Sequence, residues 1–409
     1  MSSKIPSAGI SVLAQTGALL PQESVLEIRR ERKELFIGIP KETVFSENRI
    51  ALVPESVALL VNNGHRIRIE AGAGSNANFT DSDYSEAGAE IVYSAKEAFE
   101  ADCILKVAPL SDEELAIVKD RQTIMSIVLA RNQKKEYIKA LMQKRVTGIG
   151  YEYIRDQTEL IPVIRAMSEI VGSASIIIAA EYLAKDKNGQ GIILGGITGI
   201  PPTEIVILGA GTVGEYATRT ALGLGANVRV LDSSVYRLKR LQNNIGARVY
   251  TSTISPNILS NVLKTADVVI GAIYSNNGHT PCIVSEQMVS DMKYGSVIVD
   301  VSIDQGGCFE TSQMTTHQHP VYRKYGVIHY CVPNIASRVP RTASYALSNI
   351  FTPILLAIGD RGGVDEMLWS DLHVRHGVYM FKGTITNKFM SDFFNLPFRD
   401  LDLIMASRI

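Results

Sequence analysis

Residues 205 to 214 read IVILGAGTVG, and this stretch decides the fold of the chain. Its first four residues are an apolar run typical of a buried strand, and its glycines at positions 209, 211 and 214 predict a tight turn. A helical pattern follows at 215–224, and a second apolar run at 228–231 ends beside an acid, Asp232. Strand, glycine turn, helix, strand and acid in this order predict a dinucleotide-binding Rossmann domain.

The predicted turn indicates how a dinucleotide would be held. Glycines let the backbone approach the pyrophosphate and the helix pack closely, while the helix start at Val213 and Gly214 offers unpaired N–H groups. Asp232 is expected to accept hydrogen bonds from the adenosine ribose. A carboxylate there repels a 2′-phosphate, which favours NAD over NADP, although Arg237 in the next helix weakens that preference.

Length and composition narrow the class of protein. A chain of 409 residues that is 46% hydrophobic can bury two cores, and its formal net charge of −1 argues against nucleic acid and anionic membranes as partners. No stretch approaches the roughly 18 consecutive apolar residues expected of a membrane helix. The four cysteines are widely spaced beside apolar stretches, which predicts buried free thiols in a reducing, cytoplasmic setting: Cys103, Cys282, Cys308 and Cys331.

Strand-like runs alternate with helical patterns along the chain, which favours parallel sheets with crossover helices. In a first domain, strands are expected at residues 36–39, 66–70, 103–107, 124–128 and 147–150, with helices at 54–62, 94–100, 111–119 and 134–144. After the glycine turn, further strands are expected at 248–250, 268–272, 297–301 and 328–331, followed by a long apolar helix at 344–358.

The predicted fold class is therefore α/β, with two Rossmann-like domains, parallel sheets and an interdomain cleft. We divide the chain into an N-terminal extension at 1–33, a substrate domain at 34–162, an NAD-binding domain at 163–341 and a C-terminal segment at 342–409. That last segment is too short to be a domain, so we expect it to cross back and complete the first one. Residues 23–34 have the composition of a charged helix.

Several long segments resemble the family of alanine dehydrogenases and pyridine nucleotide transhydrogenase α-subunits. They are GIPKETVFSENRIALVPESV from residue 38, HRIRIEAGAGSNANFTDSDYSEAGA from 65, MSEIVG from 167, GGITGIPPTEIVILGAGTVG from 195, VIVDVSIDQGGCFETS from 297 and YCVPNIASRVPRTASYALSN from 330. They keep their order from about residue 35 to the C-terminus. The parts IDQGGCFE and RTASYALSN resemble the alanine dehydrogenase branch.

The resemblance implies roles for particular residues. Arg49 matches the arginine that binds the substrate carboxylate, and a guanidinium suits that task because it makes two parallel hydrogen bonds. Asp304, just past a strand at the carboxyl edge of the sheet, matches an aspartate that faces nicotinamide and substrate, and we expect it to be catalytic. Asn334 matches a residue near the nicotinamide. The expected cofactor-binding residues are Ser168, Gly209, Ala210, Gly211, Thr212, Val213, Gly214, Asp232, Arg237, Ile273, Tyr274 and Asn334.

The chain also departs from the family. Alanine dehydrogenases carry a catalytic lysine and a histidine at positions that match Ala108 and Leu129, and neither residue can carry a proton. This stretch is closer to the transhydrogenase subunit. Alternate residues of a strand share a face, so Lys106 and Arg131 are candidates to supply a substitute cation, with an ordinary salt bridge as the alternative. His317 and His319 make only a weak metal signal, and no metal is expected.

These observations predict an NAD-dependent oxidoreductase of the alanine dehydrogenase type, which oxidatively deaminates L-alanine or a related small 2-amino acid to the 2-oxo acid. Arg49, Asn334 and Lys106 are the expected substrate contacts. Two alternatives stay open: a transhydrogenase-like hydride carrier, and a catalytically silent protein that binds NAD. We expect a homo-oligomer, with the apolar helix at 344–358 as an interface element, and no membrane or nucleic-acid partner.

Overall fold

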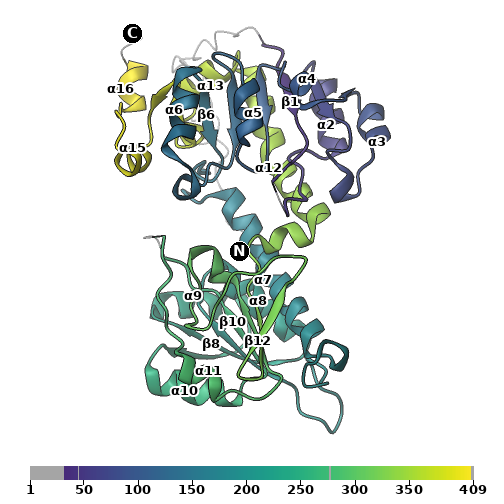
Figure 1. Cartoon of the computed structure of the whole chain (residues 1–409), viewed down its shortest axis with the longest axis vertical. Coiled ribbons are helices and arrows are strands. Elements are labelled where there is room, and N and C mark those ends of the chain that lie inside the picture. Colours follow the sequence, from purple (N-terminus) through teal and green to yellow (C-terminus); the bar gives the residue numbers. More distant parts are fainter. Residues whose placement is uncertain (1–31, 45, 276–277, 407–409) are drawn as a thin grey trace, which may run out of the picture.

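The computed structural model describes residues 32–44, 46–275 and 278–406, and they form two sheets flanked by helices. Figure 1 shows the two sheets in separate lobes stacked along the long axis, with α7 (Pro162–Leu183) and α12 (Pro340–Asp360) running between them. The predicted helix at 23–34 lies almost entirely outside the described residues. The α/β fold class with two Rossmann-like domains is confirmed.

The first sheet has the strand order β15-β14-β6-β5-β4-β1-β2-β3. Its strands are β1 (Phe36–Ile39), β2 (Arg66–Glu70), β3 (Glu90–Val92), β4 (Cys103–Leu105), β5 (Thr123–Ser126), β6 (Thr147–Gly150), β14 (Val378–Phe381) and β15 (Thr384–Ile385). The first six strands pair in parallel, whereas β14 pairs antiparallel with β6 and with β15. The C-terminal segment therefore extends the sheet of the first lobe.

Short helices surround this sheet. They are α2 (Pro54–Asn62), α3 (Asp81–Glu86), α4 (Ala95–Ala98), α5 (Asp112–Ile117), α6 (Lys135–Gln143), α13 (Val364–Ser370), α14 (Leu372–Arg375), α15 (Lys388–Phe394) and α16 (Leu401–Ala406). Local sequence fixes several helix starts: Ser111 accepts the N–H of Glu114, while the Glu114 carboxylate accepts the N–H of Ser111, which is a capping box at the start of α5.

The second sheet has the order β12-β13-β11-β10-β7-β8-β9. Its strands are β7 (Glu204–Leu208), β8 (Asn227–Asp232), β9 (Tyr250–Thr253), β10 (Val268–Gly271), β11 (Val297–Asp300), β12 (Val321–Lys324) and β13 (Val327–Tyr330), and its helices are α8 (Thr212–Gly223), α9 (Val235–Ile245), α10 (Pro256–Thr265) and α11 (Glu286–Ser290). Only β12 pairs antiparallel among these strands. The central strands β10, β11 and β13 are buried along their whole length, as parallel strands covered on both faces must be.

The structure corrects some sequence expectations. The predicted strand at 248–250 begins only at Tyr250, and the predicted long helix begins four residues early, at Pro340, because proline suits the first helical turn. Two helices, α7 and α12, are long and apolar enough by length and mean composition to cross a membrane, although polar and charged residues interrupt both and neither is a run of 18 consecutive apolar residues. They instead pack against each other and the two lobes, and the buried apolar residues of α12 join the core of the first lobe.

Candidate active site

The glycine turn joins β7 to α8, and each of its glycines meets a separate requirement. Gly209 has a φ of 111°, and a Cβ there would lie 2.3 Å from the carbonyl oxygen of Ala272. A Cβ on Gly214 would lie 1.9 Å from the carbonyl oxygen of Gly209. A Cβ on Gly211 would meet no atom within 4 Å, so this glycine faces open space. The turn is therefore closed on the protein side and open where a pyrophosphate would lie.

Asp232 ends β8, and its carboxylate links the glycine turn to the loop that follows β8. Its Oδ2 accepts the N–H of Ala210 at 2.7 Å, and its Oδ1 accepts the N–H of Ser234 at 2.7 Å. The Arg237 guanidinium lies 3.9 Å from Oδ2, and Arg240, which sequence reasoning missed, donates to the carbonyl of Ala210. Each carboxylate oxygen has a second lone pair, so Asp232 can still accept a ribose hydroxyl.

The other predicted cofactor residues lie on elements near this turn. Thr212 and Val213 are half-buried at the start of α8, and Ser168 is half-buried on α7. The N–H of Ile273, just past β10, donates to Ser302 Oγ at 3.0 Å, which fixes the loop that follows. Tyr274 is exposed. The geometry of these residues is compatible with a cofactor lying along the carboxyl edge of the sheet, as in other doubly wound folds.

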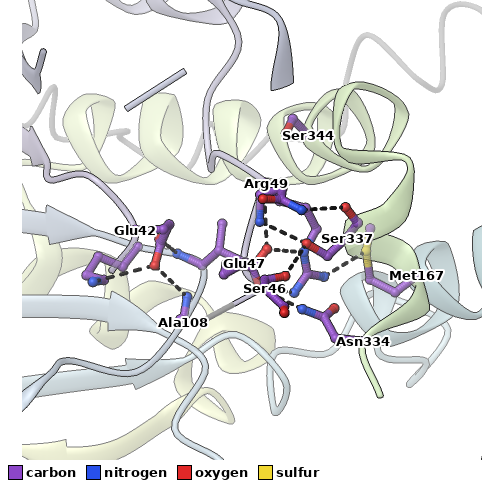
Figure 2. A network of polar contacts seen from close by, with 12 residues as sticks. Glu42, Ser46, Glu47, Arg49, Ala108, Met167, Asn334, Ser337 and Ser344 are labelled. Carbon is purple, nitrogen blue, oxygen red and sulfur yellow. Dashed lines mark hydrogen bonds and ion pairs between the residues drawn. The ribbon is translucent and has the colours of Figure 1, made fainter. Parts of the chain in front are cut away.

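Arg49 lies in the loop between β1 and α2 and is held by Glu47 (Figure 2). Its Nε donates to Glu47 Oε1 at 2.7 Å and its Nη2 to Glu47 Oε2 at 2.6 Å, a two-pronged pair that is nearly buried. Its Nη1 points to the sulfur of Met167 on α7, at 3.3 Å. Glu47 therefore occupies one side of the guanidinium and leaves hydrogens on Nη1 and Nη2 for another carboxylate.

The second lobe brings Asn334 and Asp304 to the same place. Asn334 has a φ of 56°, and its Nδ2 donates to Glu47 Oε2 at 3.0 Å. Asp304, in a short helical turn after β11, is exposed to solvent yet surrounded by protein on most sides, which raises the pKa of its carboxyl to about 6. The backbone N–H of Asn334 and the charge of Arg49 oppose that rise. Three predicted residues from distant parts of the sequence are thus neighbours.

Buried serines fix the Arg49 loop against the second half of the chain. Ser337 Oγ accepts the N–H of Asn48 at 2.8 Å, Ser344 Oγ the N–H of Ile50 at 2.9 Å, and Ser348 Oγ the N–H of Val53 at 3.1 Å. Positions 344 and 348 lie one turn apart on α12 and so share a face. Sequence reasoning found the segment that contains these serines but assigned them no role.

Lys106 lies in a buried ion pair whose member Glu42 also interacts electrostatically with Glu47 and Arg49. Its Nζ is 2.5 Å from Glu114 Oε1 and 3.5 Å from Glu42 Oε2, and its side chain is fully buried. A substrate contact would have to break this pair, because a lysine in the interior needs its counter-charge. Arg131 stacks over the Phe389 ring at 5.1 Å and lies against Gly278 of the second lobe.

Carboxyl groups hold the backbone at positions 108 and 129, where the resemblance implied a lysine and a histidine. Glu42 accepts the N–H groups of Val107 at 2.6 Å and Ala108 at 3.3 Å, and burial raises its pKa to about 7 (Figure 2). Glu152 accepts the N–H of Leu129 at 3.2 Å. Neither glutamate was singled out from the sequence, because nothing local marks a carboxyl whose partners lie on another strand.

Two more observations complete the site. His317 Nε2 lies 3.3 Å from the carbonyl oxygen of Asn334, so this histidine adjoins the site, and burial lowers its pKa. Across the described ranges, no group of three or more His, Cys, Asp or Glu side chains is arranged to hold a metal ion.

Comparisons with known proteins place the chain in a family. The model of the alanine dehydrogenase/PNT N-terminal domain matches residues 38–171, and that of the C-terminal domain matches residues 175–388. Alanine dehydrogenase 2 of Staphylococcus aureus strain USA300 is 38% identical over 367 residues, which cover 90% of this chain and 98% of the relative.

Solved structures agree with that placement. An L-alanine dehydrogenase structure is 36% identical, with a TM-score of 0.83 over 88% of this chain and 99% of that one. A transhydrogenase from Sinorhizobium meliloti is 24% identical, with a TM-score of 0.73 over 86% and 99% of the two chains, and shares the fold. The glycine turn, the Arg49 group and these matches together establish that the chain belongs to the alanine dehydrogenase/PNT family.

Proposed function

We propose that the protein is an NAD-dependent oxidoreductase of the alanine dehydrogenase type, which interconverts a small 2-amino acid such as L-alanine with its 2-oxo acid and ammonium. The observation that carries this proposal is the meeting of Arg49, Asn334 and Asp304, which puts a carboxylate binder and an acid/base group side by side. NAD would supply the hydride acceptor, and the residues around the open turn at Gly211 would hold it.

Arg49 would bind the substrate carboxylate. Glu47 fixes the plane of the guanidinium from one side, so the free hydrogens of Nη1 and Nη2 are aimed before the substrate arrives. Met167 covers the same end of the guanidinium and offers a soft apolar contact for a small side chain. Asn334 joins the pair through Glu47 and adds an amide to the wall of the site.

Asp304 would take the proton from the substrate ammonium before hydride leaves the α-carbon. A carboxyl whose pKa is about 6 is mostly ionised at neutral pH, so it can act as a base, and it is basic enough to hold the proton it receives. We assign Lys106 a structural role here, because its charge is matched inside the first lobe.

We infer a cytoplasmic homo-oligomer. All four cysteines are free thiols, which suits a reducing compartment, although Cys282 is exposed and not buried as the sequence had suggested. Most apolar residues of α12 are buried inside the subunit and are not available for a contact between subunits. The exposed Ile193, Ile197 and Ile200 are better candidates for such a contact.

A spectrophotometric assay tests the proposal. Purified protein would be incubated with NADH, ammonium and each of a panel of 2-oxo acids, and the loss of NADH absorbance would be followed. We expect consumption that requires both the oxo acid and ammonium. If NADH binds but no oxo acid is reduced, the protein is a silent NAD binder; if a second nucleotide is the only hydride acceptor, it is a transhydrogenase-like carrier.

A further inference from the structure

Glu152 follows Tyr151 just beyond the end of β6, at the edge of the sheet where β5 also ends. Its Oε1 accepts hydrogen bonds from the backbone N–H groups of Val128 at 2.8 Å and Leu129 at 3.2 Å. Because β5 and β6 are parallel neighbours, the ends of both strands present their groups on the same side of the sheet. The carboxyl group is therefore fixed beside position 129, at the edge where doubly wound folds bind ligands.

The other oxygen of this carboxyl has no partner. Glu152 Oε2 is buried and makes no hydrogen bond to any of the residues that the structure describes. A Cβ on Gly150 would stand only 3.0 Å from it, so a side chain at position 150 would crowd that oxygen. A buried polar atom without a partner lowers stability, and proteins keep such atoms mainly where a ligand or a reaction uses them.

Aromatic side chains surround Glu152, and none of the ion pairs formed by the described residues includes it. The titratable groups that face it are the hydroxyls of Tyr137 on α6, Tyr151 and Tyr153 beside it, and Tyr379 on β14. Burial raises the pKa of Glu152 to about 7, against the lowering effect of its backbone hydrogen bonds. The carboxyl is thus able to give or take a proton near neutral pH.

The surroundings of Glu152 also reach the second lobe. The Tyr153 hydroxyl interacts electrostatically with Tyr274, a predicted cofactor contact, and with Arg131, which lies against Gly278. The side chains at 108 and 129 carry no proton, and Lys106 is neutralised inside the first lobe. Near this edge, the Glu152 carboxyl can carry a proton, and its Oε2 has no hydrogen-bond partner among the described residues.

We infer that Glu152 is the catalytic residue that transfers the proton in the hydrolytic half of the deamination, acting through Oε2. This role rests on the proposed function. Water adds to the iminium carbon, a C–O bond forms as the C=N electron pair moves to nitrogen, and the Glu152 carboxylate takes a proton from the water. Glu152 then returns that proton to the amine, the C–N bond breaks as C=O forms, and the hydroxyl proton leaves with nitrogen as ammonium.

Kinetics of Glu152→Gln test this role. Glutamine can still accept the N–H groups of Val128 and Leu129 through its amide oxygen, so the strand ends stay in place. We expect kcat to fall by about 10²- to 10⁴-fold, the usual contribution of a general acid or base, with little change in the KM of the oxo acid. The wild-type kcat should change with pH near pH 7, and the kcat of the variant should lack this change. Glu152→Asp should recover part of the rate.

Stability gives a readout that needs no activity. A carboxyl with a raised pKa in the folded state stabilises the fold at low pH, and that contribution is lost as the pH rises towards about 7. Relative to Glu152→Gln, the wild-type unfolding equilibrium constant should therefore increase by about tenfold per pH unit between about pH 5 and 7, and then level off.

Glu42→Gln is the matched control, since Glu42 also has a pKa of about 7 and also holds a strand end, but both of its oxygens have partners. Relative to Glu42→Gln, the wild-type unfolding equilibrium constant should again increase between about pH 5 and 7. The pH profile of kcat for Glu42→Gln should keep its limb near pH 7. The role of Glu152 is overturned if the limb persists in Glu152→Gln with kcat within about threefold of wild type, or if Glu42→Gln removes it instead. A wild-type protein that reduces no oxo acid would overturn the proposed function itself.

Discussion

Replacing Arg49 with lysine should weaken the use of the oxo acid and leave NADH binding intact. The guanidinium uses Nε and Nη2 for Glu47, at 2.7 and 2.6 Å, and keeps hydrogens on its other edge for the substrate. Lysine has a single nitrogen, so it can satisfy Glu47 or the substrate carboxylate but cannot grip both in the same geometry. The variant loses at least one hydrogen bond between charged groups, which contributes about 1.5 to 3 kcal/mol.

That loss corresponds to a fall of about 10- to 150-fold in kcat/KM for the oxo acid, since about 1.4 kcal/mol is a factor of ten. The assay would vary the oxo acid at saturating NADH and ammonium, with the NADH Kd measured separately by fluorescence titration. Arg155→Lys is the matched control, because among the described residues the Arg155 side chain forms an ion pair with Glu159 alone, and both side chains are exposed. A kcat/KM within twofold of wild type, or a parallel loss of NADH affinity, would refute the reasoning.

Three further predictions concern the cofactor site and the buried lysine. Gly211→Ala should keep the fold but weaken NADH binding by tenfold or more, since its Cβ would project into the open side of the turn; Gly223→Ala, equally open but at the end of α8, should bind NADH normally. Asp232→Ser should narrow the preference for NADH over NADPH, and equal Kd values in the unmodified protein would contradict this. Lys106→Met should lower the free energy of unfolding by about 3 to 5 kcal/mol in urea titrations, because it leaves two carboxyls without their cation; an unchanged midpoint would show that the ion pair is not stabilising.

The sequence by itself determined the cofactor turn and the class of fold. A Cβ on Gly214 would clash with the carbonyl oxygen of Gly209 in the same turn, and Asp232 ends the very next strand along the chain. Such requirements are local, so spacing and residue type reveal them. The alternation of strands and helices likewise predicted two α/β domains, since apolar periodicity follows secondary structure directly.

The tertiary structure alone decided which polar groups meet. Asn334 lies 287 positions from Glu47, yet it donates to the same carboxylate that holds Arg49. Lys106 was expected to share a strand face with position 108, but β4 ends at Leu105, and the partners that neutralise Lys106 lie in α5 and after β1. The position of the Glu152 carboxyl beside Val128 and Leu129 likewise follows from the pairing of β5 with β6. A sequence pattern states what a side chain can do, whereas burial and the nearest charge decide what it does, and both depend on chain packing.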